Sequence, residues 1–165
     1  MTPYNVSWII HPKYKETCMS GGLEADIALL LLPTHVELSK TIRPMSLPPK
    51  SATTKQMEGA RAVVCGFGMD ENGGYPEYLK AVDITIENKV FCQKHHTASD
   101  KICARIQNKE TDCDRDSGGP VVINNTLYGL VSHGANVKKF TNSPFSAYTS
   151  IIYYRNWILE MIGKE

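Results

Sequence analysis

The chain has 165 residues, of which 42% are hydrophobic and 21% charged, with 18 Lys and Arg against 17 Asp and Glu. This length predicts one domain, or two small lobes that share a core, and a net charge of +1 gives no reason to expect binding to nucleic acid or an anionic membrane. The longest apolar run, Ile27 to Leu32, is far shorter than the ~20 residues of a membrane-spanning helix, so we expect no membrane insertion. The first residues have no basic leader followed by an apolar core, so the sequence does not predict a signal peptide there.

Segments of strand character recur along the chain and are separated by turn-forming clusters. We expect strands at Ser7 to Ile10, Ile27 to Leu32, Arg61 to Phe67, Leu79 to Ile86, Pro120 to Ile123, Leu127 to Ser132 and Ala147 to Ile151. Asn124, Asn125 and Thr126 predict a tight hairpin between two of these strands, because asparagine tolerates positive φ. The segment Asp70 to Gly74 predicts another turn, too polar to be buried.

The end of the chain differs from the rest. Apolar residues at helical spacing predict a helix from Ile151 to Gly163 that docks on the sheet. Three prolines punctuate Arg43 to Lys50 and predict an extended connector. The chain is therefore expected to be all-β and mostly antiparallel, with one C-terminal helix.

The segment Cys113-Asp114-Arg115-Asp116-Ser117-Gly118-Gly119-Pro120 carries the strongest chemical signal. Its two glycines predict a tight bend that presents the Ser117 hydroxyl and lets another chain approach closely. The neighbouring Asp116 would be costly to bury unless a cation neutralised it. Taken alone, the segment is also consistent with a surface turn.

Other motifs accompany it. Ala25-Asp26-Ile27-Ala28-Leu29-Leu30 places an acid at the head of a buried strand, and Gly129-Leu130-Val131-Ser132-His133-Gly134 lies downstream. These segments, with His11-Pro12-Lys13-Tyr14, Arg43-Pro44, Leu47-Pro48, Gly66-Phe67-Gly68, Lys101-Ile102-Cys103-Ala104 and the terminal helix, occur in the order seen in chymotrypsin/trypsin-like serine proteases. The chain resembles that family over nearly its whole length.

The resemblance implies the family's fold and chemistry. The fold would be a double antiparallel β-barrel with a C-terminal α-helix, in one peptidase domain. Residues 1–42 would be the remainder of an incomplete first barrel, 43–50 the connector, 51–150 the second barrel and 151–163 the helix. The chemistry would be hydrolysis of peptide bonds in protein or peptide substrates through an acyl-enzyme, in an extracellular protein.

The resemblance also assigns roles to single residues. Ser117 matches the nucleophile, and Asp26 matches the acid that orients a catalytic histidine. Ser132 matches a serine that hydrogen-bonds this acid, and Ser132, His133 and Gly134 would form a pocket edge that pairs with an extended substrate. Asp116 matches the acid that receives a new α-amino group when an inactive precursor is cut.

The sequence departs from the family at the catalytic histidine. The family places it before the acid, and only His11 precedes Asp26, in a loop that follows the family's histidine segment. We therefore expect His11 to be a loop residue. Without a general base, Ser117 should be little more reactive than an ordinary serine. The other histidines do not occupy the missing position: His35, His95, His96 and His133.

Arg115 is a second departure. The family has glycine there, and its N–H joins that of Ser117 in the oxyanion hole. A side chain restricts this backbone, and losing one donor costs about 2.7–4 kcal/mol of transition-state stabilisation. In an alternative interpretation the guanidinium itself aids the oxyanion.

The specificity pocket departs as well. Thr111 stands where trypsin-like members have the basal aspartate, His133 replaces a tryptophan, and Ser146 replaces a pocket-lining glycine. Cleavage after Lys or Arg is therefore not implied, although Asp112 could serve a basic side chain from a displaced position.

The chain has five cysteines. Cys92 and Cys103 match a family disulfide, whereas the usual partner of Cys113 is missing. Cys18 and Cys65 could pair with each other, with Cys113 or with residues upstream. His95, His96 and Cys92 could instead hold zinc, but adjacent histidines on a polar loop are more often solvated, so we expect no metal and no cofactor.

Two hypotheses about function follow. The chain is part of a serine endopeptidase and inactive by itself because the histidine segment is absent, or it is a non-catalytic pseudoprotease that binds proteins. The sequence does not predict its oligomeric state.

Overall fold

The computed structural model describes residues 7–17, 22–69, 74–94, 98–105, 116–134 and 145–163. Most of the elements in these ranges are strands. The strands are β1 (Ser7–Ile10), β2 (Lys15–Thr17), β3 (Gly22–Glu24), β4 (Ala28–Leu31), β5 (Arg61–Gly66), β6 (Lys80–Ile86), β7 (Lys101–Arg105), β8 (Pro120–Ile123), β9 (Thr126–Gly134) and β10 (Phe145–Ser150). The helical elements are the 3-10 turn η1 (Thr54–Met57), α1 (Lys89–Lys94) and α2 (Ile151–Met161).

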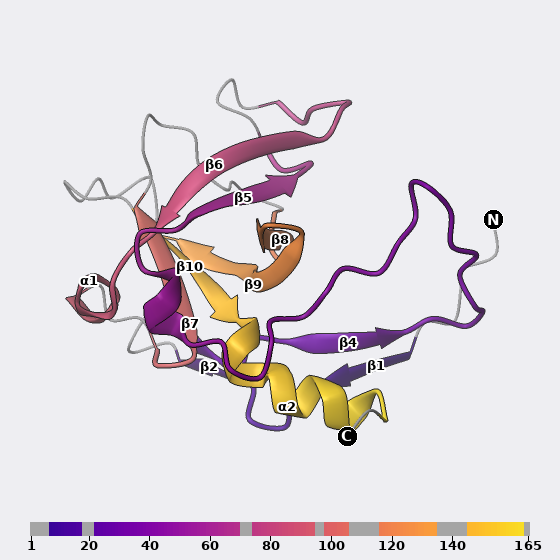
Figure 1. Cartoon of the computed structure of the whole chain (residues 1–165), viewed down its shortest axis with the longest axis horizontal. Helices are drawn as coiled ribbons and strands as arrows, with labels where there is room; N and C mark the ends of the chain where they lie inside the picture. Colours follow the sequence, from indigo (N-terminus) through magenta and orange to yellow (C-terminus); the bar gives the residue numbers. More distant parts are fainter. Residues whose placement is uncertain are drawn as a thin grey trace.

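Six strands close into an antiparallel barrel in the order β10-β7-β6-β5-β8-β9 (Figure 1). On β5, Ala62 and Val64 point into the barrel core while Arg61 and Val63 are exposed, the alternation of a strand with one buried face. Tyr148 on β10 is fully buried in this core. The prediction of a mostly antiparallel β protein with a C-terminal helix is thereby confirmed.

Two small sheets lie outside the barrel, β1–β4 and β2–β3 (Figure 1). In the β1–β4 pair, Trp8 lies opposite Leu30, and these side chains are 66% and 64% exposed. Leu29, which precedes Leu30 in β4, packs instead against the apolar cluster that α2 forms with Ala25 and Ile27. This sheet therefore leaves an apolar face uncovered among the described residues.

Helix α2 covers a second apolar cluster. It begins at Ser150, whose hydroxyl accepts a hydrogen bond from the Tyr153 N–H. Ile151, Tyr154 and Ile158 form its buried face and pack on the segment that holds Ala25 and Ile27. Asp26 lies between these two buried residues, so helix docking fixes the position of this acid. No helix in the described ranges is long and apolar enough to cross a bilayer.

Several predicted boundaries were wrong, and some elements were not predicted. Strand β9 starts at Thr126 and continues to Gly134, so the hairpin turn consists of Asn124 and Asn125, with φ of 48° and 60°. Helix α2 ends at Met161, before Gly163. The expected turn at 70–74 lies mostly outside the described residues.

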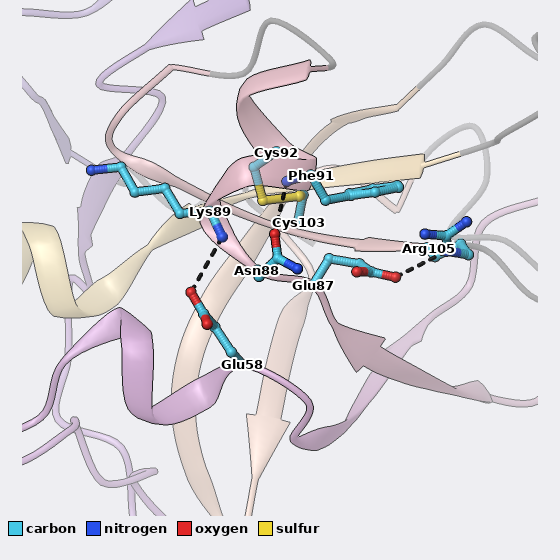
Figure 2. Close-up of a disulfide and its surroundings, with 8 residues drawn as sticks. All are labelled: Glu58, Glu87, Asn88, Lys89, Phe91, Cys92, Cys103 and Arg105. Carbon is cyan, nitrogen blue, oxygen red and sulfur yellow. Dashed lines mark hydrogen bonds and ion pairs between the residues drawn. A yellow bond between two sulfur atoms is a disulfide. The ribbon is translucent and has the colours of Figure 1, made fainter.

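The short helix α1 was not predicted, because six residues are too few to show a helical period. Asn88 supplies its N-terminal cap, accepting a hydrogen bond from Phe91 N–H at 2.9 Å. Strand β7 was missed for a different reason: residues 101–104 are all buried, so the strand shows no alternation. The predicted disulfide between Cys92 and Cys103 is present and joins α1 to β7, as Figure 2 shows.

Candidate active site

Asp26 lies just before β4, where strand β9 and the end of β10 meet it. Its carboxylate accepts a hydrogen bond from Ser132 Oγ at 2.7 Å. Its backbone carbonyl accepts another from Thr149 Oγ1 at 2.9 Å. Two strands of the barrel thus hold both the side chain and the backbone of this half-buried acid.

A buried charge network supports the segment in front of Asp26. Asp100 Oδ2 accepts hydrogen bonds from Ala25 N–H at 3.0 Å, from Lys101 Nζ at 3.1 Å and from Tyr154 Oη at 2.7 Å. Lys101 Nζ also donates to Thr149 Oγ1, the residue that holds the Asp26 carbonyl. Burial and the bond to Asp100 raise the pKa of Tyr154, so this phenol stays a donor.

Sequence reasoning missed this network. The signal that could have found it is a pair of opposite charges, Asp100 and Lys101, at the head of the apolar run 102–104. Both are buried, and a buried charge must be paired.

Ser117 lies exposed in a tight turn, as the two glycines predict. Gly118 has a φ of 85°, which a residue with a side chain rarely adopts. Its N–H donates to the Val131 carbonyl at 2.8 Å, and Val131 N–H donates to the Gly119 carbonyl at 2.9 Å. The serine turn is therefore fastened to β9, one residue from Ser132.

The carboxylate of Asp116 lies against the segment Gly66-Phe67-Gly68. Gly68 N–H donates to Asp116 Oδ1 at 2.8 Å. A Cβ added to Gly66 or Gly68 would collide with this carboxyl group. Both glycines are therefore needed for Asp116 to take its place beside Ser117.

A bulge in β9 places Ser132 and His133 together. Ala147 pairs with His133 and Tyr148 pairs with Val131, so Ser132 is an extra residue without a partner across the ladder. Ser132 Oγ and His133 Nδ1 lie 3.2 Å apart. Burial, and to a smaller extent Lys101, lower the pKa of His133, against an opposing effect of Asp26 and Asp100.

His11 occupies a different environment. It is buried, and its ring meets those of Tyr154 and Trp157 edge to face, with centroids 5.0 and 4.8 Å away. Its Nδ1 accepts a hydrogen bond from Lys13 N–H. Burial and the charge of Lys13 lower the pKa of His11. In the described structure its role is packing against α2.

The remaining predicted site residues are only partly described. Ser146 is buried on β10 and pairs with Ala104 and Gly134. Cys65 on β5 is a free thiol. No group of three metal-ligating side chains occurs among the described residues. Other candidates lie outside them: Thr111, Asp112, Arg115, His95, His96, Cys18 and Cys113.

The sequence profile of the trypsin family matches residues 3–158. The chain belongs to this family. It is 33% identical to chymotrypsin of Phaedon cochleariae over 159 residues, which are 92% of this chain and 54% of that protein. It is 32% identical to trypsin-3 of Salmo salar over 167 residues, 98% of this chain and 66% of the relative. The chain thus spans about half to two thirds of these trypsin-family relatives.

Structural comparison tests the predicted fold. Neuropsin, a serine protease of mouse brain, matches with a TM-score of 0.80 at 24% identity, over 94% of this chain and 70% of neuropsin. The predicted trypsin-like fold class is therefore confirmed.

Proposed function

We propose that this trypsin-family protein hydrolyses peptide bonds, with Ser117 as nucleophile and Asp26 as the acid that orients the base. The observation that carries the proposal is the convergence of both residues on β9. Ser132 binds the Asp26 carboxylate at 2.7 Å, and the neighbouring Val131 holds the Ser117 turn through two backbone hydrogen bonds. Residues far apart in sequence thus meet where nucleophile and acid must cooperate.

In the proposed reaction, Ser117 Oγ bonds to the scissile carbonyl carbon as its proton moves to a base. The carbon–nitrogen bond then breaks as the proton passes to the leaving amine, and water releases the acyl group. An extended substrate would pair with the edge at 132–134. Because no histidine of this sequence occupies the family's position, we expect residues 1–165 alone to hydrolyse peptides far more slowly than a protein with that histidine.

Two further assignments belong to this proposal. Asp116, already accepting a hydrogen bond from Gly68, would be the residue that binds a new α-amino group on activation. The disulfide between Cys92 and Cys103 favours an extracellular location, because such bonds persist in oxidising compartments.

The second candidate is a pseudoprotease that binds proteins without cutting them. It is favoured by His133, which stands where the family has a tryptophan. Arg115 at an oxyanion-hole position also favours it.

The test is to assay the protein isolated from its source, and its Ser117→Ala variant, on a mixed peptide library. We expect cleavage that Ser117→Ala abolishes and that Ser99→Ala, an exposed serine outside the site, leaves unchanged. Cleavage that survives Ser117→Ala overturns the assignment of the nucleophile. No cleavage by either form overturns the hydrolase and favours the binding protein.

A further inference from the structure

We propose that the buried ion pair of Asp100 and Lys101 is a positioning device, which holds the Asp26 carboxylate in its working orientation. The two residues act on the backbone at Asp26 and do not take part in the chemistry themselves. This inference rests on the proposed function, in which Asp26 is the acid of the active site.

The backbone in front of Asp26 is strained. Ala25 has a φ of 50°, in the left-handed region where the Cβ of an ordinary residue crowds the backbone. Ile27 N–H donates to the Ala25 carbonyl at 2.8 Å, so Asp26 is the central residue of a three-residue turn. A strained conformation persists only where the surrounding structure holds it. The direction of the Asp26 side chain therefore depends on the groups that hold this turn.

The ion pair holds the turn from both sides. Asp100 Oδ2 accepts a hydrogen bond from the N–H of the strained Ala25 at 3.0 Å. Lys101 Nζ donates to Thr149 Oγ1 at 3.2 Å, and this hydroxyl donates to the Asp26 carbonyl at 2.9 Å. Because Lys101 Nζ also lies 3.1 Å from Asp100 Oδ2, both contacts belong to one charged unit. A rotation of the turn would break at least one of these bonds.

The barrel and the C-terminal helix fix the ion pair itself. Ser150 N–H donates to the Asp100 carbonyl at 2.9 Å, which joins the residue before β7 to the end of β10. Tyr154 of α2 donates to Asp100 Oδ2 at 2.7 Å. The side chains of Lys101 and Asp100 are 0% and 6% exposed, so neither can turn into solvent without opening the core. The position of Asp26 is thus tied to β10 and α2 together.

The ion pair is not arranged for the greatest stability. Asp100 Oδ2 accepts all three hydrogen bonds, whereas Oδ1 is buried and has no hydrogen-bond partner among the described residues. A buried pair repays its desolvation only where its remaining lone pairs are satisfied, and apolar side chains often replace such a pair without loss. An incompletely satisfied pair whose contacts converge on one turn therefore favours a role in conformation.

The test compares Thr149→Val with Thr149→Ser in the 165-residue chain. Valine keeps the shape of threonine but lacks the hydroxyl that joins Lys101 to the Asp26 carbonyl, whereas serine retains it. Amide hydrogen exchange measured by NMR reports on the turn at Ile27 N–H and on the barrel core at Val64 N–H. In Thr149→Val we expect exchange to accelerate about tenfold more at Ile27 than at Val64, and in Thr149→Ser we expect no such difference. Equal acceleration at both amides overturns the proposal.

The double variant Asp100→Leu with Lys101→Met separates position from stability. It removes both charges and keeps the site apolar and filled. We expect its crystal structure to lack the hydrogen bond between Asp26 Oδ2 and Ser132 Oγ, which is 2.7 Å long in the wild type. A folded double variant that keeps this bond overturns the proposal. If the double variant does not fold, the exchange rates of Thr149→Val decide.

Cleavage assays distinguish this inference from the proposed function. Where the wild-type protein cleaves peptides, Thr149→Val should lower kcat about tenfold and leave KM unchanged, because the oriented acid is needed only in the transition state. An unchanged kcat overturns the positioning role. No cleavage by the wild type overturns the proposed function, and the exchange rates and the bond from Asp26 to Ser132 still decide whether the ion pair holds the turn.

Discussion

Removing Asp100 should strongly destabilise the fold. The substitution Asp100→Ala deletes the acceptor of three hydrogen bonds and leaves the Lys101 side chain, which is 0% exposed, without its counter-charge. Breaking a buried ion pair by removing one partner costs about 3–5 kcal/mol, because the remaining charge stays buried and unpaired. That cost is a large share of the 5–15 kcal/mol that stabilises a typical domain.

The assay is urea unfolding followed by tryptophan fluorescence. With a slope near 2 kcal/mol per molar urea, a loss of about 4 kcal/mol lowers the midpoint by about 2 M. Asp83→Ala provides the matched control, since Asp83 is exposed on β6 and should change the unfolding free energy by less than about 0.5 kcal/mol. If Asp100→Ala does not fold, Tyr154→Phe gives a smaller measurable loss, because it removes only the 2.7 Å hydrogen bond.

The double substitution Asp100→Leu with Lys101→Met separates the two causes of destabilisation. It removes both charges together, and apolar replacement of a buried pair is often neutral or stabilising. We therefore expect it to be more stable than Asp100→Ala. A double variant as unstable as the single one, or an Asp100→Ala protein within about 1 kcal/mol of wild type, would refute the reasoning.

Three further predictions concern other parts of the molecule. Replacing Cys92 and Cys103 by alanine should lower the unfolding free energy by about 3 kcal/mol, because the disulfide restricts the unfolded chain by closing a loop across a separation of 11 residues. A loss under about 1 kcal/mol in urea unfolding contradicts this. Leu30→Lys should reduce the binding of the dye ANS and self-association without lowering stability, because it places a charge on the exposed apolar face of the β1–β4 sheet. ANS fluorescence and sedimentation measure the two effects. An equal effect of Leu79→Lys, at an exposed leucine outside this sheet, contradicts the prediction. The urea midpoint should fall as pH decreases below about 6.5, because the pKa values of His133 and His11 are both lowered in the fold and the unfolded chain then binds more protons. His133→Gln should reduce, without abolishing, this fall between about pH 7.5 and 5.5, and parallel profiles for the two proteins contradict this.

Local patterns in the sequence predicted the parts of the fold that depend on neighbouring residues. The strands β5, β6 and β8 follow runs of apolar and β-branched residues, and the hairpin at Asn124 and Asn125 follows from the backbone freedom of asparagine. The turn at Ser117 needed glycine, and Gly118 has the positive φ that explains why.

The contacts around Asp26 could not be predicted in the same way. Its hydrogen-bond partners come from β9 and β10, and the Asp100 network beside it adds residues of β7 and α2. No local pattern brings these elements together. The ion pair of Asp100 and Lys101 is adjacent in sequence, yet its burial depends on where Thr149 and Tyr154 lie.

The sequence predicted the family, the serine turn and Asp26 as the candidate acid, because each is carried by a short motif that can be recognised locally. Which side chains surround Asp26 depends on how distant segments pack together. A single extra residue in the pairing of β9 with β10 turns Ser132 and His133 toward the same place, and a bulge has no signature in the strand's own composition. The hydrogen-bonded chain from Asp26 to His133 exists because two strands are out of step by one residue, a property of their pairing rather than of either strand alone.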